Sequence, residues 1–150
     1  MKFKIKTLEE LRLFKENLSK DYAELLNSNL KIPIKQANIL AKKEIDEIFN
    51  SLHEKHRVYN VLFKNNIIGE IWLSLNEKNK SCFIYDVKIN ENERHKGYGE
   101  KIMQSLYVFL SENSIESIEL TIYGDNKSYI DFYKKNGFEI SSVRMTKNLK

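Results

Sequence analysis

The stretch Arg94–Glu100, RHKGYGE, separates a segment typical of a β-strand from a segment typical of a helix. Residues 81–90 before it (SCFIYDVKIN) are rich in β-branched and aromatic side chains. The apolar residues after it recur at helical spacing and are Ile102, Leu106, Phe109 and Leu110. Two glycines at a strand-to-helix turn expose backbone N–H groups at the positive end of a helix, where an anion can bind. The stretch is therefore a candidate anion-binding turn, with the basic side chains of Arg94 and Lys96 beside it.

Three kinds of glycine turn differ in the residues that they require. A P-loop ends in Gly-Lys-Ser/Thr, but residues 99–102 read Gly-Glu-Lys-Ile. The dinucleotide-binding fingerprint needs a third glycine, and Ile102 stands in its place. A pair of glycines also occurs in turns that bind no ligand. The turn by itself leaves the choice between an anion site and a plain turn open.

A second pattern follows about 30 residues further on, where Gly124-Asp125-Asn126 precedes residues 129–138, YIDFYKKNGF. The pattern Arg-x-x-Gly-x-Gly after a strand resembles the acetyl-CoA signature of the GNAT superfamily of N-acetyltransferases. An asparagine before a short helix ending in Tyr-x-Lys-x-Gly-Phe is similar to the superfamily's second hallmark. Both stand in the superfamily's order and separation, and the resemblance extends from about Val58 to Leu149. The first third of the chain matches only in its pattern of predicted elements.

The resemblance implies that acetyl-CoA is the donor, that no metal is needed, and that an amine of a small molecule or a protein is the acceptor. Residues 95–100 would hold the pyrophosphate through backbone amides, and residues 86–89 would pair with the pantetheine arm as an added strand does. The cofactor-binding residues that it implies are Val87, Lys88, Ile89, Arg94, His95, Lys96, Gly97, Tyr98, Gly99, Glu100 and Asn126.

Two residues are candidates for the proton transfers that amine acetylation requires. Tyr133 matches the tyrosine that serves the superfamily as general acid for the thiolate. Its helix also places Tyr129, Phe132 and Tyr133 at a spacing typical of core aromatics, and Asn126 would also make a good N-cap. Asp86, on the strand before the glycine turn, is the candidate general base. Glu70, a water relay, or a role for Asp86 in holding the amine are the alternatives.

The composition limits the class of protein. A chain of 150 residues predicts one domain, residues 1–150, with enough length to bury a core. No run of 18 apolar residues and no secretory signal occur, and the single Cys82 predicts a buried, inert thiol in a reducing compartment, so we expect a cytoplasmic protein without membrane association. The net charge is +4, but the basic residues are interleaved with acidic ones, which does not favour nucleic-acid binding.

Hydrophobic periodicity predicts an α/β fold, in which helices pack on the faces of a mixed sheet. The resemblance implies a GNAT-like, splayed sheet of about six to seven strands flanked by about four helices. The expected strands are residues 2–6, 58–64, 67–75, 81–90, 114–123, 138–141 and 143–149, the last two as an antiparallel pair. Helices are expected after Thr7, over 21–30, after Pro33, after the glycine turn and over 127–135. Asn65-Asn66 predicts a hairpin turn, and Gly69 predicts a bulge or a close backbone approach.

Two further segments carry expectations. Residues 53–57, HEKHR, predict a solvent-exposed loop rather than a metal site, because two histidines fall short of the three or four ligands required. The helices after the first strand would flank the acceptor cleft, with Asp21, Tyr22 and Glu24 as exposed polar candidates. A non-catalytic module that senses CoA or binds a protein is the rival function, and the oligomeric state stays open, a homodimer included.

Overall fold

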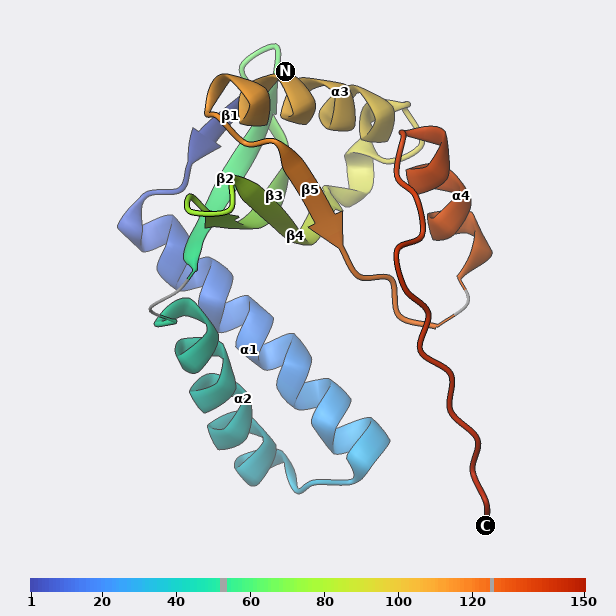
Figure 1. Cartoon of the computed structure of the whole chain (residues 1–150). Helices are drawn as coiled ribbons and strands as arrows, with labels where there is room; N and C mark the ends of the chain where they lie inside the picture. Colours follow the sequence, from blue (N-terminus) through green and yellow to red (C-terminus); the bar gives the residue numbers. More distant parts are fainter. Residues whose placement is uncertain (52–53, 125) are drawn as a thin grey trace. The chain divides into compact units, whose positions relative to one another are not determined.

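The computed structural model describes residues 1–51, 54–124 and 126–150, and the chain forms two compact units, residues 1–120 and 121–150 (Figure 1). The first unit contains a five-stranded sheet in the order β1-β2-β3-β4-β5. Its strands are β1 (Lys2–Ile5), β2 (Lys55–Phe63), β3 (Asn66–Asn76), β4 (Ser81–Ile89) and β5 (Ser117–Leu120). Neighbouring strands are antiparallel except β4 and β5, which are parallel. The predicted mixed α/β sheet is confirmed.

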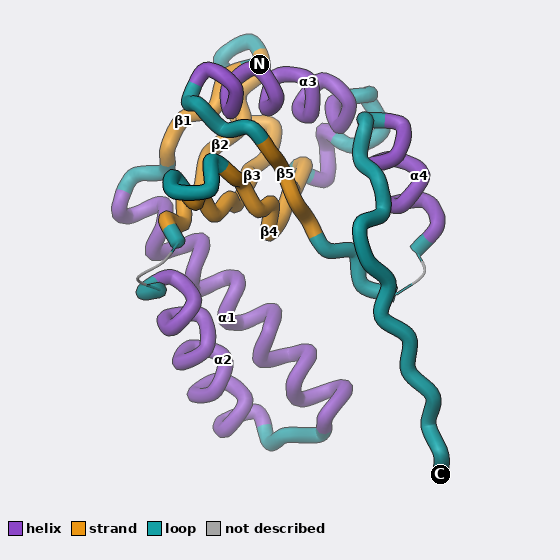
Figure 2. Tube along the Cα trace, viewed as in Figure 1, coloured by secondary structure: helices purple, strands orange, loops and turns teal. Residues whose placement is uncertain are grey.

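Helices cover both faces of this sheet. On one face lie α1 (Leu8–Leu30) and α2 (Ile34–Phe49), which run side by side in Figures 1 and 2 and pack through Ala23, Leu26, Ala37 and Ala41. Phe14 of α1 packs on Val58 and Trp72 of this face. On the other face, Phe109 of α3 (Tyr98–Glu112) contacts the rings of Phe3 and Tyr59.

The starts of these helices follow the sequence closely. The side chain of Thr7 accepts from the N–H of Glu10, and Glu10 accepts from the N–H of Thr7, which completes a capping box at the start of α1. Pro33 stands at the N-cap of α2, as predicted. The helical segments expected after Thr7 and over 21–30 form one continuous helix, which ends at Lys31 in the left-handed conformation.

The β2–β3 hairpin turns one residue earlier than predicted. Lys64 and Asn65 have φ angles of 49° and 67°, so these two residues form the tight connection. Left-handed backbone at both positions matches the right-handed twist of the strands that they join. Asn66 is already the first residue of β3.

Gly69 of β3 confirms both features expected of it. The β2–β3 register shifts beside it, since Val61 pairs with Gly69 but Leu62 pairs with Ile67. A Cβ atom on Gly69 would overlap the backbone carbonyl oxygen of Lys88 and would lie 3.1 Å from the Cα atom of Ile89. Only glycine allows β4 to approach this closely.

Residues 138–150 differ from the prediction. They form no strand, so the sheet has five strands rather than six or seven. The second unit contains α4 (Lys127–Lys135) and an extended segment in which Val143, Met145 and Leu149 are 74–89% exposed. Alternating apolar residues form a strand only where a neighbouring strand supplies hydrogen bonds, and the described part of this unit contains no such neighbour. β5 is likewise shorter than predicted.

The single thiol behaves as expected. Cys82 of β4 is 1% exposed, and burial raises its pKa to about 12. A thiol with this pKa is almost wholly protonated at neutral pH and is a poor nucleophile. The predicted buried, inert cysteine is therefore confirmed.

Gly69→Ala should destabilise the protein, because the added methyl group meets backbone atoms that side-chain rotation cannot move. We expect a loss of about 1–3 kcal/mol in the free energy of unfolding, as for other overpacked sites. Urea denaturation measures this loss against the wild-type protein. An unchanged midpoint for Gly69→Ala would contradict the close approach.

Candidate active site

The glycine turn forms the start of α3. Gly97 is the N-cap residue with φ 75°, and His95, two residues earlier, has φ 61°. Glycine has no side chain to accept hydrogen bonds from the first turn of the helix, so the N–H groups there are left for a ligand or water. A Cβ atom on Gly97 would have no protein atom within 4 Å. The turn thus combines helix N–H donors with open space in front of them.

Arg94 and Lys96 are held by their own loop. The Nε of Arg94 donates to the backbone oxygen of Ile89 at 3.0 Å, and the Nζ of Lys96 lies 3.0 Å from a carboxylate oxygen of Glu93. The two basic side chains expected beside the turn therefore both have partners nearby. Arg94 fastens the turn to the end of β4.

One edge of β4 is open beside this turn. β5 pairs with Ser81–Ile84 and ends there, whereas β3 pairs with β4 as far as Ile89. Within the described ranges, the edge of residues 85–89 that faces away from β3 has no strand partner. This is the part of the chain that was expected to pair with an extended ligand.

A β-bulge lies where the edge opens. Trp72 pairs with Asp86 and Leu73 pairs with Ile84, so Tyr85 is an extra residue in β4. The ring of Tyr85 stacks on Trp72 at 4.5 Å, and its hydroxyl donates to the Oε2 of Glu54 at 3.1 Å. Phe49 of α2 stacks on the indole with a centroid distance of 4.9 Å. These aromatic contacts hold the bulge in place.

His56 belongs to the same group of side chains, which sequence reasoning missed. Its Nδ1 accepts from the indole N–H of Trp72 at 3.0 Å, and its Nε2 lies 3.3 Å from Glu54 without the alignment of a hydrogen bond. Burial lowers the pKa of His56, although Glu54 acts in the opposite direction. The expected exposed loop is therefore wrong at His56, because β2 already begins at Lys55; His53 lies outside the described residues.

A hollow of about 170 Å³ lies between α1 and the face of the sheet that carries Trp72. It is lined by Lys6, Glu10, Leu13, Phe14, Asn17, Leu18, Asp21, Glu70, Asp86 and Lys88. The α1 residues recur at intervals of three and four, so they form one face of the helix. The sheet residues share one face because Asp86 pairs with Trp72, and Lys88 pairs with Glu70.

The two candidate bases differ in their surroundings. Glu70 lies 3.0 Å from the Nζ of Lys6, which also donates to Asn60 at 2.7 Å. Asp86 has no ion pair within the described residues. Although Asp86 is an exposed residue, partial desolvation by the surrounding protein raises the pKa of its carboxyl, with a further contribution from Glu70. A hydrogen bond from the N–H of Val87 and the charge of Lys88 oppose this shift. Asp86 is therefore better suited than Glu70 to accept a proton.

The second unit holds the other two predicted residues, Asn126 and Tyr133. The Oδ1 of Asn126 accepts from the N–H of Tyr129 at 3.4 Å and from the hydroxyl of Ser128 at 2.9 Å. Asn126 is thus the N-cap of α4, which was the alternative interpretation. Its part in cofactor binding stays a prediction.

Tyr133 takes part in the end of α4. The N–H of Phe138 donates to the backbone oxygen of Tyr133 at 3.0 Å, and the N–H of Gly137 donates to that of Lys134 at 3.1 Å. Gly137 has φ 90°, and the rings of Tyr133 and Phe138 are 5.3 Å apart. This is a complete Schellman motif with its hydrophobic contact. The catalytic role of Tyr133 stays a prediction.

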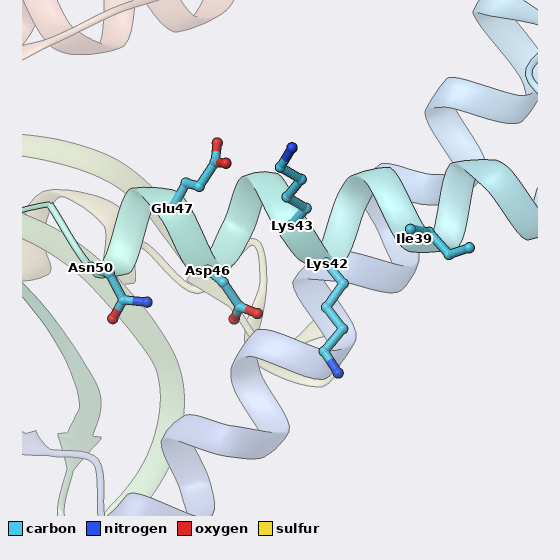
Figure 3. A pocket seen from close by; sticks show the side chains of 6 residues that line it. All are labelled: Ile39, Lys42, Lys43, Asp46, Glu47 and Asn50. Carbon is cyan, nitrogen blue, oxygen red and sulfur yellow. The ribbon is translucent and has the colours of Figure 1, made fainter.

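A larger hollow, of about 470 Å³, lies on the outer side of α2 (Figure 3). Its lining residues are Ile39, Lys42, Lys43, Asp46, Glu47 and Asn50. All six belong to one helix, so no second element contributes groups that would converge on a ligand. The smaller hollow is the better candidate because α1, β3 and β4 all contribute to it.

The described residues contain no group of three or more His, Cys, Asp or Glu residues placed to hold a metal ion. None of the described helices combines the length and the apolar character that crossing a membrane requires.

Comparison with known proteins gives the family. The sequence profile of the acetyltransferase (GNAT) family matches residues 21–138, so the chain belongs to this family. It is 25% identical over 147 residues, 94% of each chain, to YycN of Bacillus subtilis, which is named an uncharacterized N-acetyltransferase. YdgE of the same organism, with the same kind of name, is 29% identical over 84 residues, 55% of this chain and 54% of YdgE. The expected enzyme class, an acyltransferase, is confirmed.

The crystal structure of YycN also resembles this chain, with a TM-score of 0.79 at 23% identity. The match covers 99% of this chain and 98% of YycN. At this identity the likeness concerns the fold, and it confirms the predicted GNAT-like architecture.

Proposed function

We propose that residues 1–150 act as one domain that transfers the acetyl group of acetyl-CoA to an amine. The observation that carries this proposal is the open edge of β4, which residues 90–97 connect to the uncapped start of α3. The family match, which includes residues of both units, supports it.

The residues of the turn and of β4 fit the donor. The N–H groups at the start of α3 suit a pyrophosphate, because the helix dipole and the absent Cβ of Gly97 both favour an anion there. The open backbone of residues 86–89 suits an extended arm with two amides, in the manner of an added strand. When bound, acetyl-CoA supplies an activated thioester carbonyl. The N–H groups of β4 can also stabilise negative charge on the thioester oxygen.

Asp86 connects the donor site with the acceptor site, since it belongs both to the open part of β4 and to the hollow under α1. In the proposed reaction its carboxylate accepts a proton from the attacking amine. A carbon–nitrogen bond forms at the acetyl carbon, the carbon–sulfur bond breaks, and Tyr133 donates the proton that the sulfur takes up. Glu70 takes no part in the proton transfer and forms the ion pair with Lys6.

Gly97→Val should abolish acetyl-CoA binding, because the added side chain occupies the space in front of the helix N–H groups. We expect at least a tenfold loss of affinity in a calorimetric titration. Left-handed backbone also costs a branched residue about 1–2 kcal/mol, and Gly137→Val, at φ 90°, controls for this strain. Unchanged affinity in folded Gly97→Val would overturn the placement of the pyrophosphate.

Asp86→Asn should lower kcat by about 10²- to 10⁴-fold, the range for loss of a general base. Only ionised Asp86 accepts a proton, so kcat/KM should rise with pH through its raised pKa. Glu70→Gln removes a like charge that raises this pKa and should therefore move the acidic limb to lower pH. An acidic limb that persists in Asp86→Asn would assign the base to another group.

Tyr133→Phe should keep acetyl-CoA bound but lower kcat by about ten- to a thousand-fold, as expected for the loss of a general acid. The helix end should survive, because its hydrogen bonds come from the backbone and the ring remains. Tyr129→Phe, at an exposed tyrosine on the same helix, is the matched control. Equal turnover in both variants would show that Tyr133 is not the general acid and serves only to end the helix.

A further inference from the structure

The charge of the hollow under α1 is opposite to that of the chain. The whole sequence carries +4, but four carboxylates and two ammonium groups line the hollow, which leaves a net charge of −2. Of the two ammonium groups, that of Lys6 is already paired with Glu70. Asp86 and Asp21 have no ion pair among the described residues. The hollow therefore favours a cationic ligand.

The carboxylates are separated along an elongated wall. The lining residues of α1 run from Glu10 to Asp21, which spans about 16 Å at 1.5 Å per residue. Phe14 packs on Trp72, the strand partner of Asp86, so Asp86 lies near the level of Phe14. Asp21 stands two helical turns further on, about 10 Å along the axis.

Apolar side chains line the hollow between these carboxylates. Leu13, Phe14 and Leu18 belong to the same face of α1 as Asp21. A hydrocarbon chain that covered them would be stabilised by a free energy of roughly 25 cal/mol for each Å² of apolar surface removed from water. The Phe14 ring already has an ammonium group near its face, with the Nζ of Lys6 6.0 Å from its centroid.

We propose that the acceptor is a linear aliphatic amine with at least two amino groups, one placed for acetylation at Asp86 and the next bound by Asp21. This inference rests on the proposed function, of which it names the substrate class. The methylene chain lies along Leu13, Phe14 and Leu18. Asp21 is then a specificity-determining residue, because it distinguishes a diamine from a monoamine of the same length.

The size of the hollow supports a slender acceptor. At about 170 Å³ it is smaller than the 300–1,000 Å³ usual for sites that enclose drug-sized ligands. Acidic acceptors are disfavoured by the net negative charge. A lysine side chain of a protein has the right width but carries no second ammonium at its reacting end, so it would leave Asp21 unused.

The test compares different amines as acceptors, and it compares the wild-type protein with a variant that lacks the charge of Asp21. Diamines H₂N–(CH₂)n–NH₂ with n from 3 to 8, the matching monoamines and a lysine-containing peptide are assayed by thiol release from acetyl-CoA. We expect diamines to have the lowest KM, with the longer ones preferred. Asp21→Asn should raise the KM of diamines about two- to fivefold, as for an exposed ion pair, and raise the KM of monoamines less.

Asp46→Asn is the matched control, because Asp46 is also an exposed helical aspartate but lies on the outer side of α2. A selective KM effect of Asp21→Asn, absent in Asp46→Asn, supports the inference. Equal use of monoamines or the peptide, with no effect of Asp21→Asn, overturns the inference and leaves the acetyltransferase function standing.

A second readout separates the two proposals. If acetyl-CoA binds but no amine releases thiol, the proposed function fails. Calorimetric titration with 1,7-diaminoheptane in the absence of acetyl-CoA then decides what the hollow binds. Binding that weakens in Asp21→Asn and not in Asp46→Asn supports a diamine site, and absence of binding to the wild-type protein overturns it.

Discussion

The stacking of Tyr85 on Trp72 is the contact on which the candidate site depends. It involves the extra residue of β4, at the point where β5 stops pairing. Residues 81–84 of β4 have strand partners on both edges, whereas residues 85–89 pair only with β3. Phe49 covers the other side of the indole, and the indole N–H is satisfied by a buried His56. A buried polar pair of this kind costs more to break than it contributes when intact, which favours a single arrangement of the bulge.

The close approach at Gly69 is the second constraint on the same strand. β3 can hold β4 as far as Ile89 only because no Cβ stands between them. Arg94 then joins the end of β4 to the glycine turn through the carbonyl oxygen of Ile89. The open edge and the turn are thereby held together through the Arg94 side chain and the backbone of β4, which leaves the other backbone groups of this region for a ligand.

Local patterns made much of this fold predictable. The bounds of α4, the cap at Thr7 and the strand before the glycine turn all follow from residues adjacent in sequence. The hollow was not predictable, because it arises where α1 crosses two strands whose register depends on bulges. His56 was missed because its neighbours in sequence are charged, whereas its burial comes from Phe49 and Trp72. The two strands predicted over 138–141 and 143–149 do not form, because alternation of apolar residues alone supplies no hydrogen-bonding partner.

The second hallmark shows why a motif and a role have to be argued separately. In Tyr-x-Lys-x-Gly-Phe, the tyrosine, glycine and phenylalanine occupy the C3, C′ and C″ positions of a Schellman motif, so stopping a helix already accounts for all three. What a helix end does not require is a hydroxyl, since phenylalanine would make the same ring contact. The Schellman motif therefore explains the ring of Tyr133 and leaves its hydroxyl to be explained separately.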